Sequence, residues 1–150
     1  MAIDYHWIVP NIAQGSFPSP LSEALKHADT IVFCAEEKQP RIGKLPLGKA
    51  VLRLPFDDDI YRPIPPEAGR IFHQMAHRLA REARSGRRVL ITCAMGLNRS
   101  GIITALTLMH AHGMAPADAI RLIRGKRSRD ALMNPMFEQW LLHQPRPRRR

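Results

Sequence analysis

The sequence predicts one α/β domain with a central, mainly parallel sheet flanked by helices on both faces. Short apolar runs suited to buried strands alternate along the chain with helix-length segments, which is the order of a mainly parallel sheet. The 150 residues and the 45% apolar content fit a single domain with its own core. We assign residues 1–144 to this domain. Residues 145–150, two prolines and four arginines, cannot bury apolar surface and are predicted to be a basic, flexible tail.

The predicted strands are short apolar runs bounded by turn-forming residues. Pro10 separates the first two, and a loop rich in Pro, Gly and Lys over residues 36–49 separates the next two. The last strand leads directly into the most informative loop of the chain. The strands are expected at residues 7–9, 11–13, 30–34, 50–54 and 88–92.

The predicted helices are recognised by their start and stop signals and by apolar spacing. Prolines stand at or just before several predicted starts, and glycines such as Gly86, Gly113 and Gly125 mark the ends. The longest helix carries apolar residues at helical spacing, namely Ile71, Phe72, Met75, Leu79 and Ala83. The helices are expected at residues 21–28, 67–84, 99–112, 116–124 and 135–143.

The chain is strongly basic, with a net charge of +10. Part of the excess lies in the tail, and another part forms a run near residue 125. This run is either a solvated face or a surface that steers a polyanionic or phosphorylated partner, and both interpretations stay open. Its members are Arg121, Arg124, Lys126, Arg127 and Arg129.

Several classes of protein are excluded. Two cysteines, Cys34 and Cys93, do not make a disulfide scaffold. No stretch approaches the roughly 20 apolar residues that span a bilayer, and the first residues lack the pattern of a signal peptide. We therefore expect a soluble, cytoplasmic protein with no membrane span. His73 and His77 stand four residues apart, but no third ligand accompanies them, so we expect a helix surface and no metal.

The segment from Thr92 to Gly101 predicts an anion-binding loop between a strand and a helix. Cys93 and Arg99 have five residues between them, and Gly96 allows the backbone to curl tightly. Amides of residues 94–99 then converge at the positive end of the helix dipole, which favours a tetrahedral anion. The amide-bearing residues are Ala94, Met95, Gly96, Leu97, Asn98 and Arg99.

The residues in this loop suit phosphoryl transfer. The positive field that binds the anion also favours the thiolate of Cys93, which attacks phosphorus in line. Arg99 offers a planar, two-pronged contact to two oxygens, and the Ser100 hydroxyl is placed to help the sulfur leave. The leaving oxygen needs a proton from a carboxylic acid. The run 57–59, three aspartates at the end of a predicted strand, supplies the candidates.

With these residues, the chain resembles the dual-specificity branch of the cysteine-dependent protein phosphatases over residues 7–142. The resemblance rests on the loop from Cys93 to Gly101 and on Leu54-Pro55-Phe56-Asp57-Asp58. It implies Cys93 as nucleophile, Arg99 as clamp and Asp58 as general acid, with Asp57 and Asp59 as alternatives. The family usually has histidine where Thr92 stands, so activity or pH optimum is expected to differ. Asn134, Phe137 and Leu141 resemble the closing helix of the family.

The resemblance implies hydrolysis of phosphate monoesters without metal or cofactor. The expected substrate is a phosphorylated protein, mainly phosphotyrosine, with phosphoserine and phosphothreonine in addition. The alternative is an RNA 5′-triphosphatase or a phosphoinositide phosphatase, because Asn98 before Arg99 resembles the RNA enzymes and the surface is basic. A phosphate-binding module without catalysis is the third reading, and Thr92 is its only support.

Cys34 ends a predicted buried strand, which is the ordinary place for a core cysteine. The run Val32-Phe33-Cys34 also resembles a strand of the cyclin-dependent-kinase-associated phosphatase whose cysteine pairs with the nucleophile. This resemblance implies the hypothesis that Cys34 protects Cys93 by a reversible disulfide.

Overall fold

The computed structural model describes residues 2–147 and contains a five-stranded sheet in the order β1-β2-β5-β3-β4. β1 runs antiparallel to β2, and the other neighbouring pairs are parallel. The mainly parallel sheet predicted from the sequence is therefore confirmed. The strands are β1 (Tyr5–Val9), β2 (Ile12–Gly15), β3 (Thr30–Ala35), β4 (Ala50–Phe56) and β5 (Val89–Thr92).

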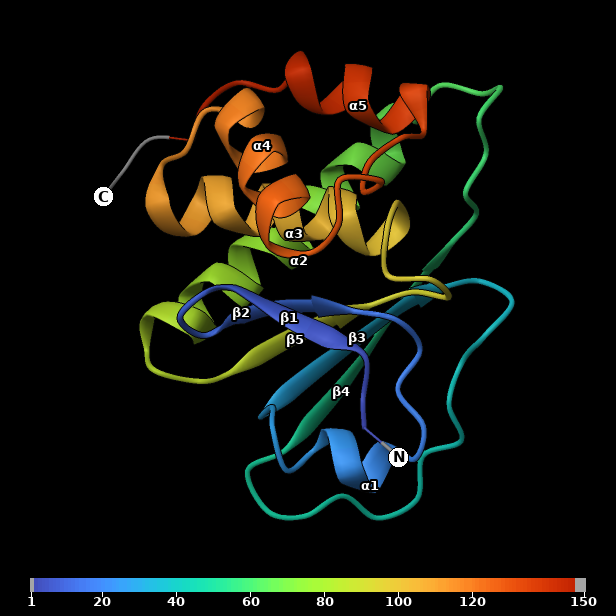
Figure 1. Cartoon of the computed structure of the whole chain (residues 1–150), viewed down its shortest axis with the longest axis vertical. Helices are drawn as coiled ribbons and strands as arrows, with labels where there is room; N and C mark the ends of the chain where they lie inside the picture. Colours follow the sequence, from blue (N-terminus) through green and yellow to red (C-terminus); the bar gives the residue numbers. More distant parts are fainter. Residues whose placement is uncertain (1, 148–150) are drawn as a thin grey trace.

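Helices cover both faces of the sheet, as predicted, but unequally (Figure 1). α1 lies on one face, and the four remaining helices lie on the other. α3 is the central member of this layer, since it contacts α2, α4 and α5 as well as three strands. The helices are α1 (Leu21–Ala24), α2 (Pro66–Arg84), α3 (Arg99–His112), α4 (Pro116–Lys126) and α5 (Pro135–Leu142).

Several predicted boundaries were wrong. β1 begins two residues before the expected start, and β2 ends two residues after the expected end. The helix expected over 21–28 ends at Ala24, because the amides of Lys26 and His27 bond three residues back and form tight turns. Gly125 does not end α4, which continues to Lys126. β4 runs past Leu54 to Phe56 through Pro55, which an edge strand tolerates because one side of it has no partner strand.

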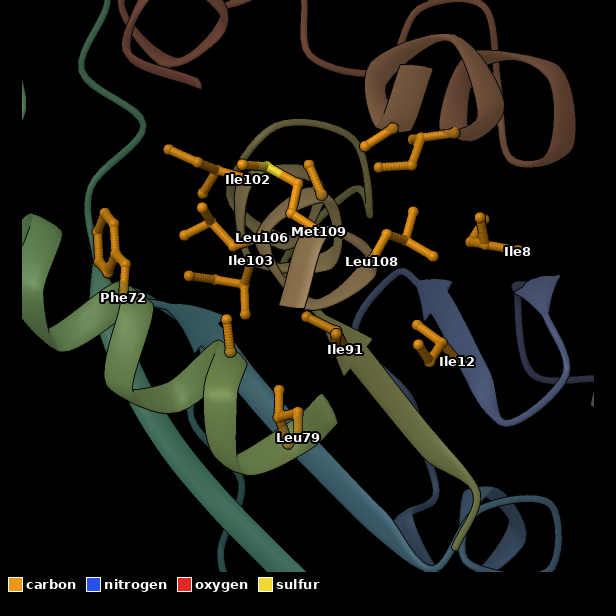
Figure 2. Close-up of a cluster of buried hydrophobic side chains, with 14 of the residues drawn as sticks. Ile8, Ile12, Phe72, Leu79, Ile91, Ile102, Ile103, Leu106, Leu108 and Met109 are labelled. Atoms are coloured by element: carbon orange, nitrogen blue, oxygen red, sulfur yellow. The ribbon is translucent and has the colours of Figure 1, made fainter. Parts of the chain in front are cut away.

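The sheet separates two apolar clusters, and successive side chains of β3 point alternately into one cluster and the other. Ile31 and Phe33 pack on the α1 side, while Val32 and Cys34 pack on the side of the larger helical layer. Figure 2 shows the larger cluster, in which sheet residues such as Ile91 meet Leu79 of α2 and a row of α3 side chains. One residue of the predicted α2 stripe, Ile71, is 49% exposed and lies outside the core.

The parallel arrangement brings the carboxyl ends of β2, β5, β3 and β4 to one edge of the sheet. Four loops therefore meet there, and α3 begins at the same place. Twelve of the fourteen α3 residues are buried, so the start of this helix is fixed by packing along its whole length. In the part of the chain that the structure describes, none of the helices is long and apolar enough to cross a bilayer.

Only part of the predicted tail lies within the described residues. There, Arg146 donates from Nε to the carbonyl oxygen of Gly113 at 2.5 Å, at the end of α3. Residues 148–150 lie outside the described residues.

Candidate active site

Gly96 lies in the loop between β5 and α3, in a backbone conformation that other residues rarely adopt. Its φ is +70°. A Cβ on Gly96 would stand 2.4 Å from the carbonyl carbon of Gly15 and 2.5 Å from its oxygen. The loop thus passes directly over the end of β2, and only glycine fits at this point.

The carbonyl oxygens of residues 94–98 in this loop all accept hydrogen bonds from other residues. Because a trans peptide holds C=O and the next N–H in opposite directions, outward carbonyls turn the following amides inward. None of the hydrogen bonds found within residues 2–147 is donated by the amides of residues 94–99. The loop is therefore a preformed ring of free N–H donors, the geometry that binds an oxyanion. Backbone amides donate to three of these carbonyl oxygens, namely Phe17 to Ala94, Leu132 to Leu97 and Ile102 to Asn98. Side chains donate to the other two, namely Arg127 to Met95 and both Gln14 and Arg127 to Gly96.

Arg127 has an internal role that the sequence did not reveal. Its guanidinium donates to the carbonyl oxygens of Gly96 (3.0 Å) and Met95 (3.1 Å) and pairs with both carboxylate oxygens of Asp4 at 2.8 Å. Its side chain is only 5% exposed. The bond from Arg127 lowers the pKa of Asp4 to about 2, so this carboxylate is charged at neutral pH. Arg127 is thus neither solvated nor a steering charge, and that part of the basic run was misinterpreted.

Gln14 is a second support that the sequence did not indicate. It lies fully buried in β2, just beyond the strand expected at residues 11–13. Its Nε2 donates to the carbonyl oxygen of Gly96 at 3.0 Å and to Oγ of Ser100 at 3.2 Å. Gln14 therefore fixes the turn of the loop and the first turn of α3 together.

Cys93 lies at the floor of the ring, 3% exposed. Its Sγ is 3.3 Å from Oγ of Ser100, so the predicted neighbours are brought together. The N-terminus of α3 points at the same space and supplies positive potential there. Thr92 is fully buried, and its hydroxyl donates to the carbonyl oxygen of Val32 at 2.7 Å, so it ties β5 to β3 next to the cysteine.

Arg99 is held from behind by a carboxylate that the sequence analysis missed. Its two terminal nitrogens donate to Glu37 Oε1 at 2.5 Å and Oε2 at 2.7 Å, and one also donates to the carbonyl oxygen of Phe56 at 3.3 Å. The Arg99 bond lowers the pKa of Glu37 to about 2. Nε of Arg99 is buried and has no partner within the described chain. One edge of the guanidinium is therefore occupied, and the Nε edge is available for an anion.

Asp58 is the aspartate of the 57–59 run that contacts the loop. Its Oδ2 accepts from Nδ2 of Asn98 at 2.9 Å, and its Oδ1 accepts from Nδ2 of Asn134 at 2.6 Å. Asp57 and Asp59 make local contacts, since Asp57 accepts from the Asp58 amide and Asp59 accepts from the amides of the turn that follows. The two asparagines thus join the aspartate loop, the ring and α5.

The remaining candidates lie as follows. The Met95 side chain is 70% exposed, while Leu97 packs against the core. His73 contacts His110 and Gln144 through its two ring nitrogens, at 3.0 and 2.8 Å. Residues 2–147 contain no group of three or more His, Cys, Asp or Glu side chains arranged to hold a metal ion.

Cys34 lies close to the ring of amides, on the strand beside it. β3 and β5 pair with Phe33 opposite Thr92, so Cys34 of β3 comes next to Cys93, the first residue after β5. Both belong to the same apolar cluster and both are free. Burial first, and the neighbouring Cys93 next, raise the pKa of the Cys34 thiol well above its ordinary value.

Comparison with known proteins gives one family and several similar folds. The family model for the catalytic domain of dual specificity phosphatases matches residues 23–146. The fold is similar to that of a mouse putative dual specificity phosphatase complexed with zinc tungstate, with 20% identity, a TM-score of 0.75, and 94% of this chain and 86% of that chain covered. It is also similar to human DUSP28, with 22% identity, a TM-score of 0.74, and 94% and 92% covered. A search of curated proteins finds no match.

We predict that Gly96→Ala weakens binding of inorganic phosphate at least about tenfold, because the loop must move away from Gly15 and the backbone strain is of order 1–3 kcal/mol. Calorimetric titration with phosphate measures the first effect and urea unfolding the second. Gly125→Ala is the matched control, since a Cβ there meets nothing within 4 Å. Equal phosphate affinity in both variants would contradict the preformed ring.

Proposed function

The chain belongs to the dual specificity phosphatase family, and on that premise we propose that it hydrolyses phosphotyrosine in proteins, and phosphoserine and phosphothreonine as well, through a cysteinyl-phosphate intermediate. The observation that carries the proposal is the ring of inward, unpaired amides above Cys93. Such a ring matches the equatorial oxygens of a phosphoryl group, whose charge must be balanced before a bond forms. The similar mouse protein was crystallised in complex with zinc tungstate, and tungstate, like phosphate, is a tetrahedral oxyanion.

In the first step, the Cys93 thiolate attacks phosphorus from below. The P–S bond forms while the bond to the leaving oxygen breaks, and this oxygen takes a proton from Asp58. Asp58 suits this role because Asn98 and Asn134 hold its carboxyl group beside the ring. Asp57 and Asp59 remain the alternatives, but the hydrogen bonds that their carboxylates accept come from their own loop.

Arg99 and Glu37 act together on the transferred group. A guanidinium can bind one anion along its two terminal nitrogens and a second along its Nε edge. Glu37 takes the first edge, and we assign the second to two phosphoryl oxygens. Glu37 is therefore a positioning residue, which fixes the plane of the guanidinium before substrate arrives.

In the second step, water attacks the cysteinyl-phosphate and Asp58 accepts its proton. The P–S bond breaks, and sulfur leaves as a thiolate. The hydroxyl of Ser100, 3.3 Å from Sγ, is placed to donate a hydrogen bond to that thiolate. The ring is formed with Thr92 in the place where the family usually has histidine, so this replacement is no argument for a module that binds phosphate without catalysis.

The contacts favour a protein substrate over RNA or inositol lipid. The Asn98 amide, which suggested RNA, bonds Asp58. Within the basic run, Arg127 holds the loop, and Arg124 donates to the carbonyl oxygens of Ala131 and Leu132. Fewer charges are therefore free to bind a polyanion than the sequence suggested. Parallel assays on phosphotyrosine peptide, triphosphorylated RNA and phosphoinositide decide among the three.

We predict that Cys93→Ser lowers kcat by about 10⁴-fold or more while phosphate binding survives. Asp58→Asn should lower kcat on phosphotyrosine peptide about 10²–10⁴-fold, with a smaller loss on p-nitrophenyl phosphate, whose leaving oxygen needs less protonation. Asp57→Asn and Asp59→Asn are the matched controls and should retain most activity. Substantial turnover by Cys93→Ser would refute the covalent route. If Asp57→Asn or Asp59→Asn lost more activity than Asp58→Asn, that aspartate would be the general acid in place of Asp58.

We also propose that Cys34 protects Cys93 during oxidation. Its raised pKa leaves Cys93 to react first, forming a sulfenic acid with peroxide. The Cys34 sulfur then attacks that sulfur, water leaves, and a disulfide closes. Mass spectrometry after mild peroxide should show the Cys34–Cys93 bridge in the wild type and sulfinic Cys93 in Cys34→Ser. Only sulfinic Cys93 in both proteins would dismiss the hypothesis.

A further inference from the structure

A cavity of about 200 Å³ lies beside the aspartate loop, and neither Asn98 nor Asn134 is among its lining residues. We propose that it binds an aromatic side chain of the substrate, next to a basic residue, in a segment flanking the phosphorylated residue. This inference rests on the proposed function and names the substrate class more closely. The cavity is lined by Phe56, Asp57, Asp59, Arg62, Pro63, Ile64, Pro65, Ala68, Phe72 and Phe137.

The floor of the cavity is aromatic. The centroid of the Phe56 ring lies 4.5 Å from the centroid of the Phe72 ring and 6.0 Å from that of the Phe137 ring. Pockets for drug-sized molecules usually span about 300–1,000 Å³, so this smaller space suits a single side chain. An aromatic ring extends the existing cluster with the offset or edge contacts that such rings favour.

The mouth of the cavity carries opposite charges, but the acidic side dominates. Asp57 and Asp59 both line it, whereas Arg62 is 87% exposed and stands 3.7 Å from Asp59, a weak surface pair. The bond recorded for the Asp57 carboxylate comes from its own loop. On a chain with net charge +10, this is a local acidic site, and it favours a lysine or arginine beside the aromatic residue.

The aspartate loop connects the cavity to the catalytic site along the chain, since Asp57 and Asp59 line the cavity and Asp58 contacts the ring. Phe56 forms its floor and also accepts from Arg99 through its carbonyl oxygen at 3.3 Å. The same loop leaves Ile60 and Tyr61 47% and 84% exposed, and exposed apolar side chains grouped beside a site mark a contact surface. A phosphopeptide with its phosphate over Cys93 therefore reaches the cavity by crossing this loop.

The test uses four series of phosphotyrosine peptides, which carry the dipeptide Phe-Arg, Phe-Glu, Ala-Arg or Ala-Ala. Within each series, the dipeptide is moved one residue at a time away from the phosphotyrosine, on its N-terminal or its C-terminal side. We expect kcat/KM for the best-placed Phe-Arg peptide to exceed that for Ala-Ala about tenfold, with Phe-Glu and Ala-Arg between them. Ala68→Leu fills the cavity and should remove this preference while hydrolysis of p-nitrophenyl phosphate is retained. Ala117→Leu, on the exposed surface of α4, is the matched control.

The outcomes separate the two proposals. If the wild type fails to hydrolyse p-nitrophenyl phosphate, the proposed function itself is wrong. If it hydrolyses this ester but treats all peptides alike, the cavity does not read the substrate, whatever the variants do. A preference that persists in folded Ala68→Leu would also overturn the assignment, because another surface would then be responsible.

Discussion

The outward bonding of five consecutive carbonyl oxygens is the constraint on which the catalytic site depends. It alone converts an ordinary strand-to-helix loop into a ring of free amides. Its partners come from distant parts of the chain: Gln14 from β2, Arg127 from the end of α4, and Leu132 from the segment before α5. Each donor is itself fixed, Gln14 by burial in the sheet and Arg127 by Asp4. The ring therefore exists before substrate arrives.

Preorganisation of charge follows from the same arrangement. Glu37 balances Arg99 without using the Nε edge, and Asn98 and Asn134 hold Asp58 in place with neutral donors. Asn134 also caps α5 by accepting from the amides of Met136 and Phe137. Helix start, acid loop and ring are thus one connected unit. A phosphoryl group entering it meets oriented dipoles and needs little reorganisation of the protein.

The sequence predicted what local pattern and spacing control. Alternating apolar runs gave the mainly parallel sheet, and the spacing of Cys93 and Arg99 located the loop. The aspartate run 57–59 was reached because the carboxyl ends of parallel strands meet at one edge, and the choice of Asp58 within it rested on the family resemblance. Glu37 follows β3 at that same edge, so this rule offered a signal for it that was not used. Helix ends were less predictable, since Gly125 stays within α4 and the Arg127 amide still bonds the carbonyl oxygen of Ile123 four residues back.

Gln14 and Arg127 could not be found in this way, because their roles depend on contacts between segments far apart in the sequence. A glutamine in a short strand reads as an interruption, and an arginine in a basic run reads as solvated. Ile71 shows the converse, since its position fits the apolar stripe of α2 but its side chain lies outside the core.

The most direct test is a crystal structure of the protein with bound tungstate. The account predicts the anion over Cys93, with its oxygens accepting from the amides of residues 94–99 and from Nε of Arg99, while Glu37 keeps the terminal nitrogens. An anion bound elsewhere, or loop carbonyls turned toward the centre with Arg99 facing away from Cys93, would contradict it.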